Sequence, residues 1–168
     1  MSEIPSTPAD GNVCVLVVPA IADMNAVPAT ALTGAGVVDI SCYLTGDGYN
    51  PSLDQQVIAD ERLCSTETFE QPGRAQRGLE TTYIDNTNSP NEDEDNKAKE
   101  TLQPYSTHVL AVRRGIAWDT APAADQTWTF SPIKCGLYND LPPEANSVLK
   151  TQQKQFITGR TVTSRLTA

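Results

Sequence analysis

Basic residues are scarce in this chain. It has 12 Lys and Arg against 21 Asp and Glu, which gives a formal net charge of -9 over 168 residues. A surface of this sign repels the phosphates of nucleic acids and of anionic membranes, so tight binding to either is disfavoured. Aromatic residues make up only 6% and do not cluster with basic ones, so no platform for stacking nucleic-acid bases is visible. Transient contact with DNA, as a wall to which the DNA does not stick, is still compatible with the charge.

The chain also lacks a long apolar run. The longest, residues 13–22, contains Pro19 and is far too short to span a bilayer, which takes about 20 apolar residues. Residues 1–12 hold two acids, two prolines and no basic residue, so we expect no signal peptide. We therefore expect a protein that is made and used in the cytoplasm or released by lysis, with no membrane partner.

The four cysteines form no CxxC pair and lie far apart in the sequence, at Cys14, Cys42, Cys64 and Cys135. All four fall in segments that we predict to be strands. In a reducing compartment this pattern favours four buried thiols over a disulfide framework or a zinc site.

Little in the chain can support catalysis or hold a cofactor. The single histidine, His108, lies among apolar neighbours, and a general base needs a positioned partner. The glycine-rich segments 34–36 and 46–48 lack the spacing of phosphate-binding loops. The stretch 85–95 departs from a calcium loop because Pro90 stands where glycine is required. We therefore expect no catalytic residue, no cofactor, no metal site and no enzyme.

Alternating and apolar segments, typical of β-strands, make up most of the chain. They predict a mainly β protein, a β-sandwich or partly closed barrel of about eight strands. We expect one domain over residues 1–168, with residues 1–11 as a flexible arm. The predicted strands are 12–18, 37–44, 55–65, 78–85, 107–114, 127–138, 148–157 and 160–166.

Turn residues divide these strands. Segment 45–51 predicts a loop, and 71–73, which reads Gln-Pro-Gly, predicts a turn. Residues 148–166 are interpreted as a closing hairpin with its turn at 158–159. The middle of that hairpin, residues 150–155, is polar on both faces. Because a strand normally buries at least one face, this segment predicts either an exposed edge or a wall that faces water inside an assembly.

One α-helix is predicted, over residues 90–103. Ser89 and Glu92 have the spacing of a capping box, and Pro90 fits the first helical position. Lys97 and Lys99 follow Asp93 and Asp95 by four residues, which favours ion pairs within the helix. The acids could bind a cation weakly, but a solvated helix start is the better interpretation. We expect this helix to flank the β-structure.

Seven short segments, in the same order along nearly the whole chain, resemble a known family. They are 42–48, 60–65, 69–74, 83–87, 113–115, 134–136 and 142–147. As an ordered set they are similar to the major tail tube proteins of long-tailed (siphovirus-type) actinobacterial phages. No single segment is diagnostic.

The resemblance implies a structural virion protein. Six subunits of the family form a ring by joining strands into a continuous inner barrel, and rings stack around a tape-measure protein. The resulting tube is a conduit for DNA ejection, through which DNA passes without specific binding. Further partners would be the tail terminator and tail-tip proteins. The protein would reside in the virion tail, after assembly in the host bacterial cytoplasm.

Two other classes of function stay open at this point. One is a β-sandwich that decorates a phage capsid or binds at the tail tip. The other is a small hydrolase or isomerase that depends on His108. In a tube subunit, loops with exposed apolar or arginine side chains would carry the contacts between copies. The candidates for contacts between subunits or rings are Phe69, Pro72, Arg74 and Trp118, and the candidates for the lumen are Gln152 and Lys154.

Overall fold

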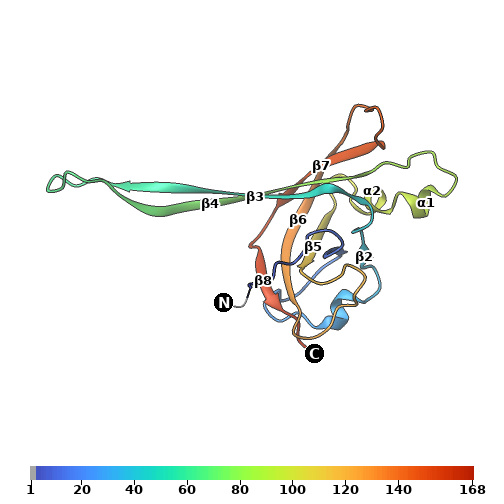
Figure 1. Cartoon of the computed structure of the whole chain (residues 1–168), viewed down its shortest axis with the longest axis horizontal. Helices are drawn as coiled ribbons and strands as arrows, with labels where there is room; N and C mark the ends of the chain where they lie inside the picture. Colours follow the sequence, from blue (N-terminus) through green and yellow to red (C-terminus); the bar gives the residue numbers. More distant parts are fainter. Residues whose placement is uncertain (1–2) are drawn as a thin grey trace.

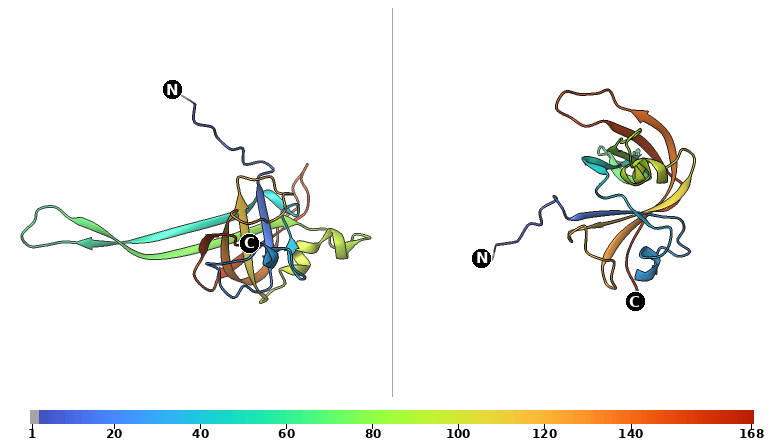
Figure 2. Two further views of the ribbon diagram at one scale, coloured as in Figure 1. Left: turned by 90° about the horizontal axis from the view of Figure 1, so that it is seen from below. Right: turned by 90° about the vertical axis from the view of Figure 1, so that its right-hand side faces the viewer.

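A computed structural model describes residues 3–168, which form one antiparallel, eight-stranded sheet. Figure 1 shows a compact body from which a long two-stranded arm projects. The sheet order is β2-β1-β5-β6-β7-β4-β3, and β8 also pairs with β6. The sheet curls into a half-barrel, seen end-on in the right-hand view of Figure 2, so the prediction of a mainly β, partly closed fold is confirmed. The strands are β1 (Val13–Val18), β2 (Val38–Asp39), β3 (Leu44–Asp60), β4 (Phe69–Ile84), β5 (Thr107–Arg114), β6 (Thr127–Asp140), β7 (Lys150–Ile157) and β8 (Val162–Arg165).

The centre of the sheet is buried on both sides. Successive residues of a strand point to opposite faces, and five consecutive residues of β1 and five of β5 are buried. This double coverage explains the continuous apolar run at the start of the chain, and it means that both candidate core faces of β5 are buried. The short 3-10 helix η1 (Ala29–Leu32) lies on one side and α2 (Lys97–Thr101) on the other. One apolar cluster includes Val15, Tyr83, Leu102 and Leu110, and the other includes Leu16, Leu32, Ala111, Trp128 and Phe130.

The arm consists of the outer parts of β3 and β4. β4 pairs with β7 only from Leu79 to Ile84, and beyond Gly78 the two arm strands pair only with each other. They are 17 and 16 residues long, much longer than the sequence pattern predicts. The left-hand view of Figure 2 shows the arm outside the curled body.

The predicted loop at 45–51 and the predicted turn at 71–73 are wrong, because both segments lie inside strands. The register of β3 and β4 shifts at each place, which marks two β-bulges. A Cβ on Gly48 would collide with the carbonyl oxygen of Thr82, and one on Gly73 would lie 2.8 Å from the carbonyl oxygen of Gln56. The glycines therefore allow close approach of two backbones rather than reversal of the chain.

The predicted closing hairpin is also wrong. β7 and β8 do not pair with each other but with different halves of β6, on either side of Pro132. Pro132 has no N–H to donate, and its carbonyl oxygen accepts a hydrogen bond from the Thr158 amide at 3.0 Å. After β7 the chain thus leaves the sheet beside Pro132, and it returns as β8 to the same edge of β6, on the other side of the proline. Two other predicted strands have different bounds: segment 37–44 contains only β2 and the first residue of β3, and segment 55–65 is the outer part of β3, which ends at Asp60.

The predicted helix 90–103 is divided into α1 (Glu92–Asp95) and α2, with Asn96 between them. The Asn96 side chain is buried and accepts a hydrogen bond from the Asn86 amide at 3.2 Å, which ties the break to the preceding loop. The expected capping box is absent from this part of the described chain. The N-cap is Asn91, and the Glu92 carboxylate accepts from the Asn88 amide at 3.1 Å instead.

The polar middle of β7 is neither an edge nor exposed on both faces. β7 lies between β6 and β4, and its side chains Thr151, Gln153 and Gln155 are buried. The Gln153 amide nitrogen donates to the carbonyl oxygens of Leu102 and Gly136, each at 2.8 Å. The Gln155 amide nitrogen donates to Gln153 at 3.0 Å. The water-facing interpretation is thus wrong for one face of β7, because hydrogen bonds make burial of these polar groups tolerable.

We expect Gln153→Leu to lower the free energy of unfolding by about 3 kcal/mol, because it leaves two buried carbonyl oxygens without donors. Gln152→Leu is the matched control, since Gln152 lies one position away on the opposite, partly exposed face. Urea denaturation followed by circular dichroism measures both. Equal effects of the two substitutions would contradict a special role for the buried amide.

Candidate assembly surfaces

The arm exposes apolar side chains on both faces. Leu53, Val57, Ile58 and Phe69 are each more than half exposed, and Leu63 at the tip is fully exposed. An isolated two-stranded ribbon is only marginally stable in water. Exposed apolar side chains gathered on such a ribbon mark a surface that contacts another chain.

Three of the four predicted contact residues lie together on this arm. Phe69 stands opposite Asp60 and Pro72 opposite Val57, with Arg74 a few positions nearer the body. Trp118 does not join them. It lies on the body, 39% exposed, where its amide donates to the carbonyl oxygen of Gly11 at 2.9 Å.

Sequence reasoning missed the apolar side chains of β3 in the arm. The signal was present, because the predicted strand 55–65 carries charges on both faces. A strand that mixes polar and apolar residues on both of its faces is consistent with a ribbon that is solvated on both sides. The prediction of four buried thiols is also wrong for two of them: Cys14 and Cys135 are buried, whereas Cys42 and Cys64 are exposed in the turn before β3 and in the arm-tip loop.

The two lumen candidates lie on the face of β7 opposite the buried glutamines. Lys154 is exposed and stands opposite Glu80 of β4, and its ammonium group lies 5.2 Å from the centre of the Phe156 ring. Gln152 is partly buried and stands opposite Asn139 of β6. The structure therefore places both candidates on one outer face formed by β6, β7 and β4, which also exposes the apolar side chains of Leu137 and Phe156.

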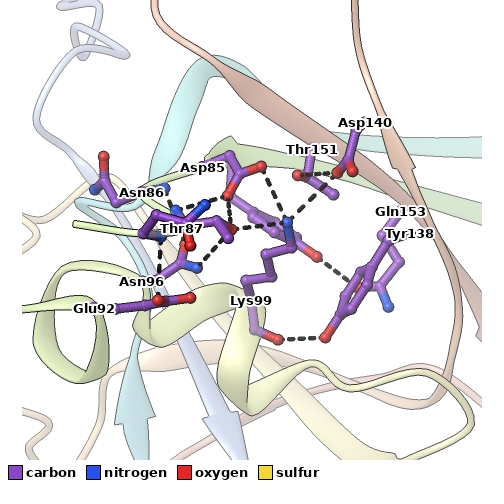
Figure 3. A network of polar contacts seen from close by, with 12 residues as sticks. Asp85, Asn86, Thr87, Glu92, Asn96, Lys99, Tyr138, Asp140, Thr151 and Gln153 are labelled. Atoms are coloured by element: carbon purple, nitrogen blue, oxygen red, sulfur yellow. Dashed lines mark hydrogen bonds and ion pairs between the residues drawn. The ribbon is translucent and has the colours of Figure 1, made fainter.

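A network around Lys99 fastens α2 to the sheet (Figure 3). The ammonium group lies 3.0 Å from a carboxylate oxygen of Asp85 and 3.5 Å from one of Asp140. The Tyr138 hydroxyl donates to the Lys99 carbonyl oxygen at 2.6 Å. Lys99 thus binds acids outside its helix, and the predicted ion pair with Asp95 is wrong because these partners lie on β6 and after β4.

Asp85 is the most enclosed carboxylate of this network, with its side chain only 14% exposed. Burial raises the pKa of Asp85, but hydrogen bonds from Thr87 and Lys99 lower it by more, so the net pKa lies below its ordinary value. The ionised form of Asp85 is therefore the form that the folded protein favours.

A cavity of about 280 Å³ opens at the base of the arm. Most of its lining is apolar, and Arg114 is the one charged residue among the lining residues of the described chain. A neighbouring hollow shares part of this lining and adds Cys42 and Trp118. The cavity is lined by Val13, Val15, Ser41, Leu44, Thr45, Gly46, Tyr49, Pro51 and Arg114.

Groups suited to catalysis are not assembled in residues 3–168. The His108 ring nitrogen Nε2 lies 3.0 Å from the Ser106 hydroxyl, which itself donates to the Gln103 carbonyl oxygen at 2.6 Å. That hydroxyl proton is already engaged, so the pair does not have the arrangement of a base that activates a nucleophile. The described residues contain no group of three or more potential metal ligands. They also contain no helix with the length and apolar character that crossing a membrane requires.

A curled β-sheet with an unsupported arm and exposed apolar side chains has the features of a protein that contacts other chains. A family model described as phage tail tube protein matches residues 1–167. The chain therefore belongs to the phage tail tube protein family.

The fold is also found in a solved structure. A chain of the structure titled "Cryo-EM structure of the anti-feeding prophage (AFP) baseplate, 6-fold symmetrised" is similar with a TM-score of 0.55 at 11% identity. The similarity covers 95% of this chain and 97% of that chain. No curated protein matches the sequence significantly.

The lowered pKa of Asp85 sets the sign of a pH effect. Its contribution to stability is fully present above the unfolded-state pKa of about 3.9 and is lost as pH falls through the lower folded-state pKa. Between about pH 5 and about pH 2 we expect wild type to lose more free energy of unfolding than Asp85→Asn. Asp119→Asn, which changes an exposed carboxylate, is the control and should retain the wild-type slope. Parallel slopes for all three proteins in urea titrations would refute the role of Asp85.

Proposed function

We propose that this protein is the subunit of a phage tail tube, which self-assembles into stacked hexameric rings that conduct DNA during ejection. The observation that carries the proposal is the arm, whose exposed apolar side chains find no partner within the described chain. Membership of the tail tube family supports it. The six-fold symmetry named for the structure of similar fold supports a ring of six.

Strand joining between subunits accounts for the open edges of the sheet. The outer edge of β3 is unpaired over its whole length among the described residues, and β2 at the other end of the sheet has only two residues. A long free edge is a template for pairing with another chain unless it is covered. In a ring, each contact joins two different surfaces, and the ring closes when the rotation between neighbouring copies is a sixth of a turn.

In this proposal the outer face of β6, β7 and β4 lines the lumen, with Gln152 and Lys154 on it. The net charge of -9 keeps the DNA from sticking. Three lysines share this face, Lys134, Lys150 and Lys154; Glu80 stands opposite Lys154, and a Glu144 carboxylate oxygen lies 4.0 Å from the Lys150 ammonium group. The tape-measure protein would fill the lumen before ejection, and the tail terminator and tail-tip proteins would bind the two ends of the tube.

The phage would be a siphovirus of an actinobacterial host, and the subunit would be assembled in the host cytoplasm and reside in the virion tail. Its role requires no catalysis and no cofactor. Phe69, Pro72 and Arg74 on the arm, with Trp118 on the body, would contact neighbouring subunits or rings. Residues 1–168 would act as one domain, with residues 1–11 as a flexible N-terminal arm that is distinct from the two-stranded arm. Residues 1–2 lie outside the described part, and residues 3–10 are exposed.

A second candidate is a tail-tip or capsid-decoration protein. The similarity to a chain from a baseplate structure favours the tail-tip form of it. Such a protein would stay monomeric or trimeric alone and would bind a preformed particle, whereas a tube subunit polymerises with itself.

We expect the purified protein to form rings or tubes in negative-stain micrographs at high concentration. The double variant Phe69→Ser, Arg74→Glu should remain folded but lose assembly by at least about tenfold in sedimented protein, because it removes apolar burial and reverses a charge on the arm. Gln71→Ser on the same strand is the matched control and should assemble like wild type. A wild-type protein that stays monomeric at every concentration would rule out the tube.

The lumen position of Lys154 can be tested with thiol labelling. In a background with Cys42→Ser and Cys64→Ser, we expect Lys154→Cys to react with a polymer-linked maleimide as a monomer but not in tubes, because the reagent is too large to enter. Asp93→Cys on exposed α1 should react in both states. Labelling of Lys154→Cys in intact tubes at the monomer rate would place this residue outside the lumen.

A further inference from the structure

The tip of the arm has the form of an apolar knob with acidic flanks. Leu63 is the most exposed large apolar residue of the described chain. At the end of β3, next to this loop, Asp60 is neutralised by Arg62, whose guanidinium lies 2.9 Å from its carboxylate. Glu61 and Glu67 have no such ion pair within the described residues. The tip therefore presents one leucine and excess negative charge.

The cavity at the base of the arm has the complementary character. Its lining includes apolar side chains of Val13, Leu44 and Tyr49, and its one charged residue, Arg114, is positive and exposed. Its volume of about 280 Å³ is ample for a leucine side chain. A cavity that accepts an apolar group beside a cation suits a leucine that is flanked by carboxylates.

The arm cannot fill the cavity of its own chain. The cavity lies where the arm leaves the body, and the tip lies at the far end of the arm (Figure 1). The eight residue steps from Ser52 to Asp60, at about 3.3 Å each, separate the two by roughly 25 Å in a straight ribbon. Only the tip of another copy can reach it.

We propose that Leu63 of one copy inserts into the cavity beside Arg114 of the next copy, with Glu61 or Glu67 facing the guanidinium. This inference rests on the proposed function, because both require copies of the chain to associate. It goes further in naming where the tip of the arm binds, the cavity beside Arg114, which we call the seat. The contact joins two different surfaces, so it propagates from copy to copy and generates a ring or a filament.

Two native thiols can report the contact without any added cysteine. Cys64 is adjacent to Leu63, and Cys42 is adjacent to Ser41, which lines the cavity. Both thiols are exposed, whereas Cys14 and Cys135 are buried. If the tip is seated, Cys64 of one copy and Cys42 of the next lie within the span of a short bismaleimide.

The full-length protein is treated with a short bismaleimide and analysed on denaturing gels. Wild type should give a ladder of covalent oligomers, whereas Cys42→Ser alone and Cys64→Ser alone should give none. An equal mixture of the two variants should give covalent dimers and nothing larger, because each dimer then holds one Cys64 and one Cys42 and no further pair.

Substitutions at the seat should follow the same pattern. Leu63→Ser should lower the dimer yield of the mixture by at least about tenfold, because a leucine side chain leaves its apolar environment. Thr66→Ser in the same loop is the matched control. Arg114→Glu should lower the yield, and reversal of both Glu61 and Glu67 to lysine should restore it. Arg165→Glu, which changes an exposed arginine elsewhere on the body, should have no effect.

The outcomes separate the seat from the proposed function. Tubes in micrographs without covalent dimers in the mixture would overturn the seat and leave the tube intact. Dimers that are unaffected by Leu63→Ser would also overturn it. Specific dimers from a protein that never forms rings or tubes would support the seat and overturn the tube. Circular dichroism of each variant establishes that a lost dimer reflects lost contact rather than lost folding.

Discussion

The pairing of β4 with β7 is the constraint on which the other surfaces of this protein depend. The inner half of β4 is held there by backbone pairing and by buried hydrogen bonds, such as that from the Gln155 amide to the Thr81 hydroxyl at 3.0 Å. A shift of one residue would turn Gln152 and Lys154 into the core and leave the buried carbonyl oxygens without donors. The register is therefore strongly specified. Because β4 continues without interruption into the arm, the same pairing fixes where the arm leaves the body.

The two faces of β7 have different roles: the inner face stabilises the core, and the outer face contacts the surroundings. On the inner face, Gln153 binds the carbonyl oxygen of Leu102 and so connects the sheet to the end of α2, which Lys99 fastens from the other side. On the outer face, Lys154 is free to contact solvent or other molecules. A body held this firmly can support an arm that has no core of its own. The apolar side chains of the arm then remain available for another chain, as a subunit of an assembly requires.

Local patterns predicted the elements better than their connections. The apolar runs of β1 and β5 and the alternation of β6 were sufficient to predict strands there. Glycine and proline were misleading at residues 45–51 and 71–73, because a bulge and a turn have the same local composition. What distinguishes them is whether an opposing strand continues past the extra residue, and that strand lies elsewhere in the chain. The broken helix has a similar cause, since Asn96 is held by the distant amide of Asn86.

By itself the sequence determined the mainly β class, the apolar segments, the negative surface and the absence of a recognisable catalytic motif, since these follow from composition and spacing. It also placed Phe69, Pro72 and Arg74 among the contact candidates. Only the tertiary structure decided that these three share an arm, that Trp118 lies apart from them, and that the polar strand β7 has a buried face. Burial and strand partners depend on segments that are far apart in sequence. The chain therefore encodes its elements locally but its surfaces only through the completed sheet.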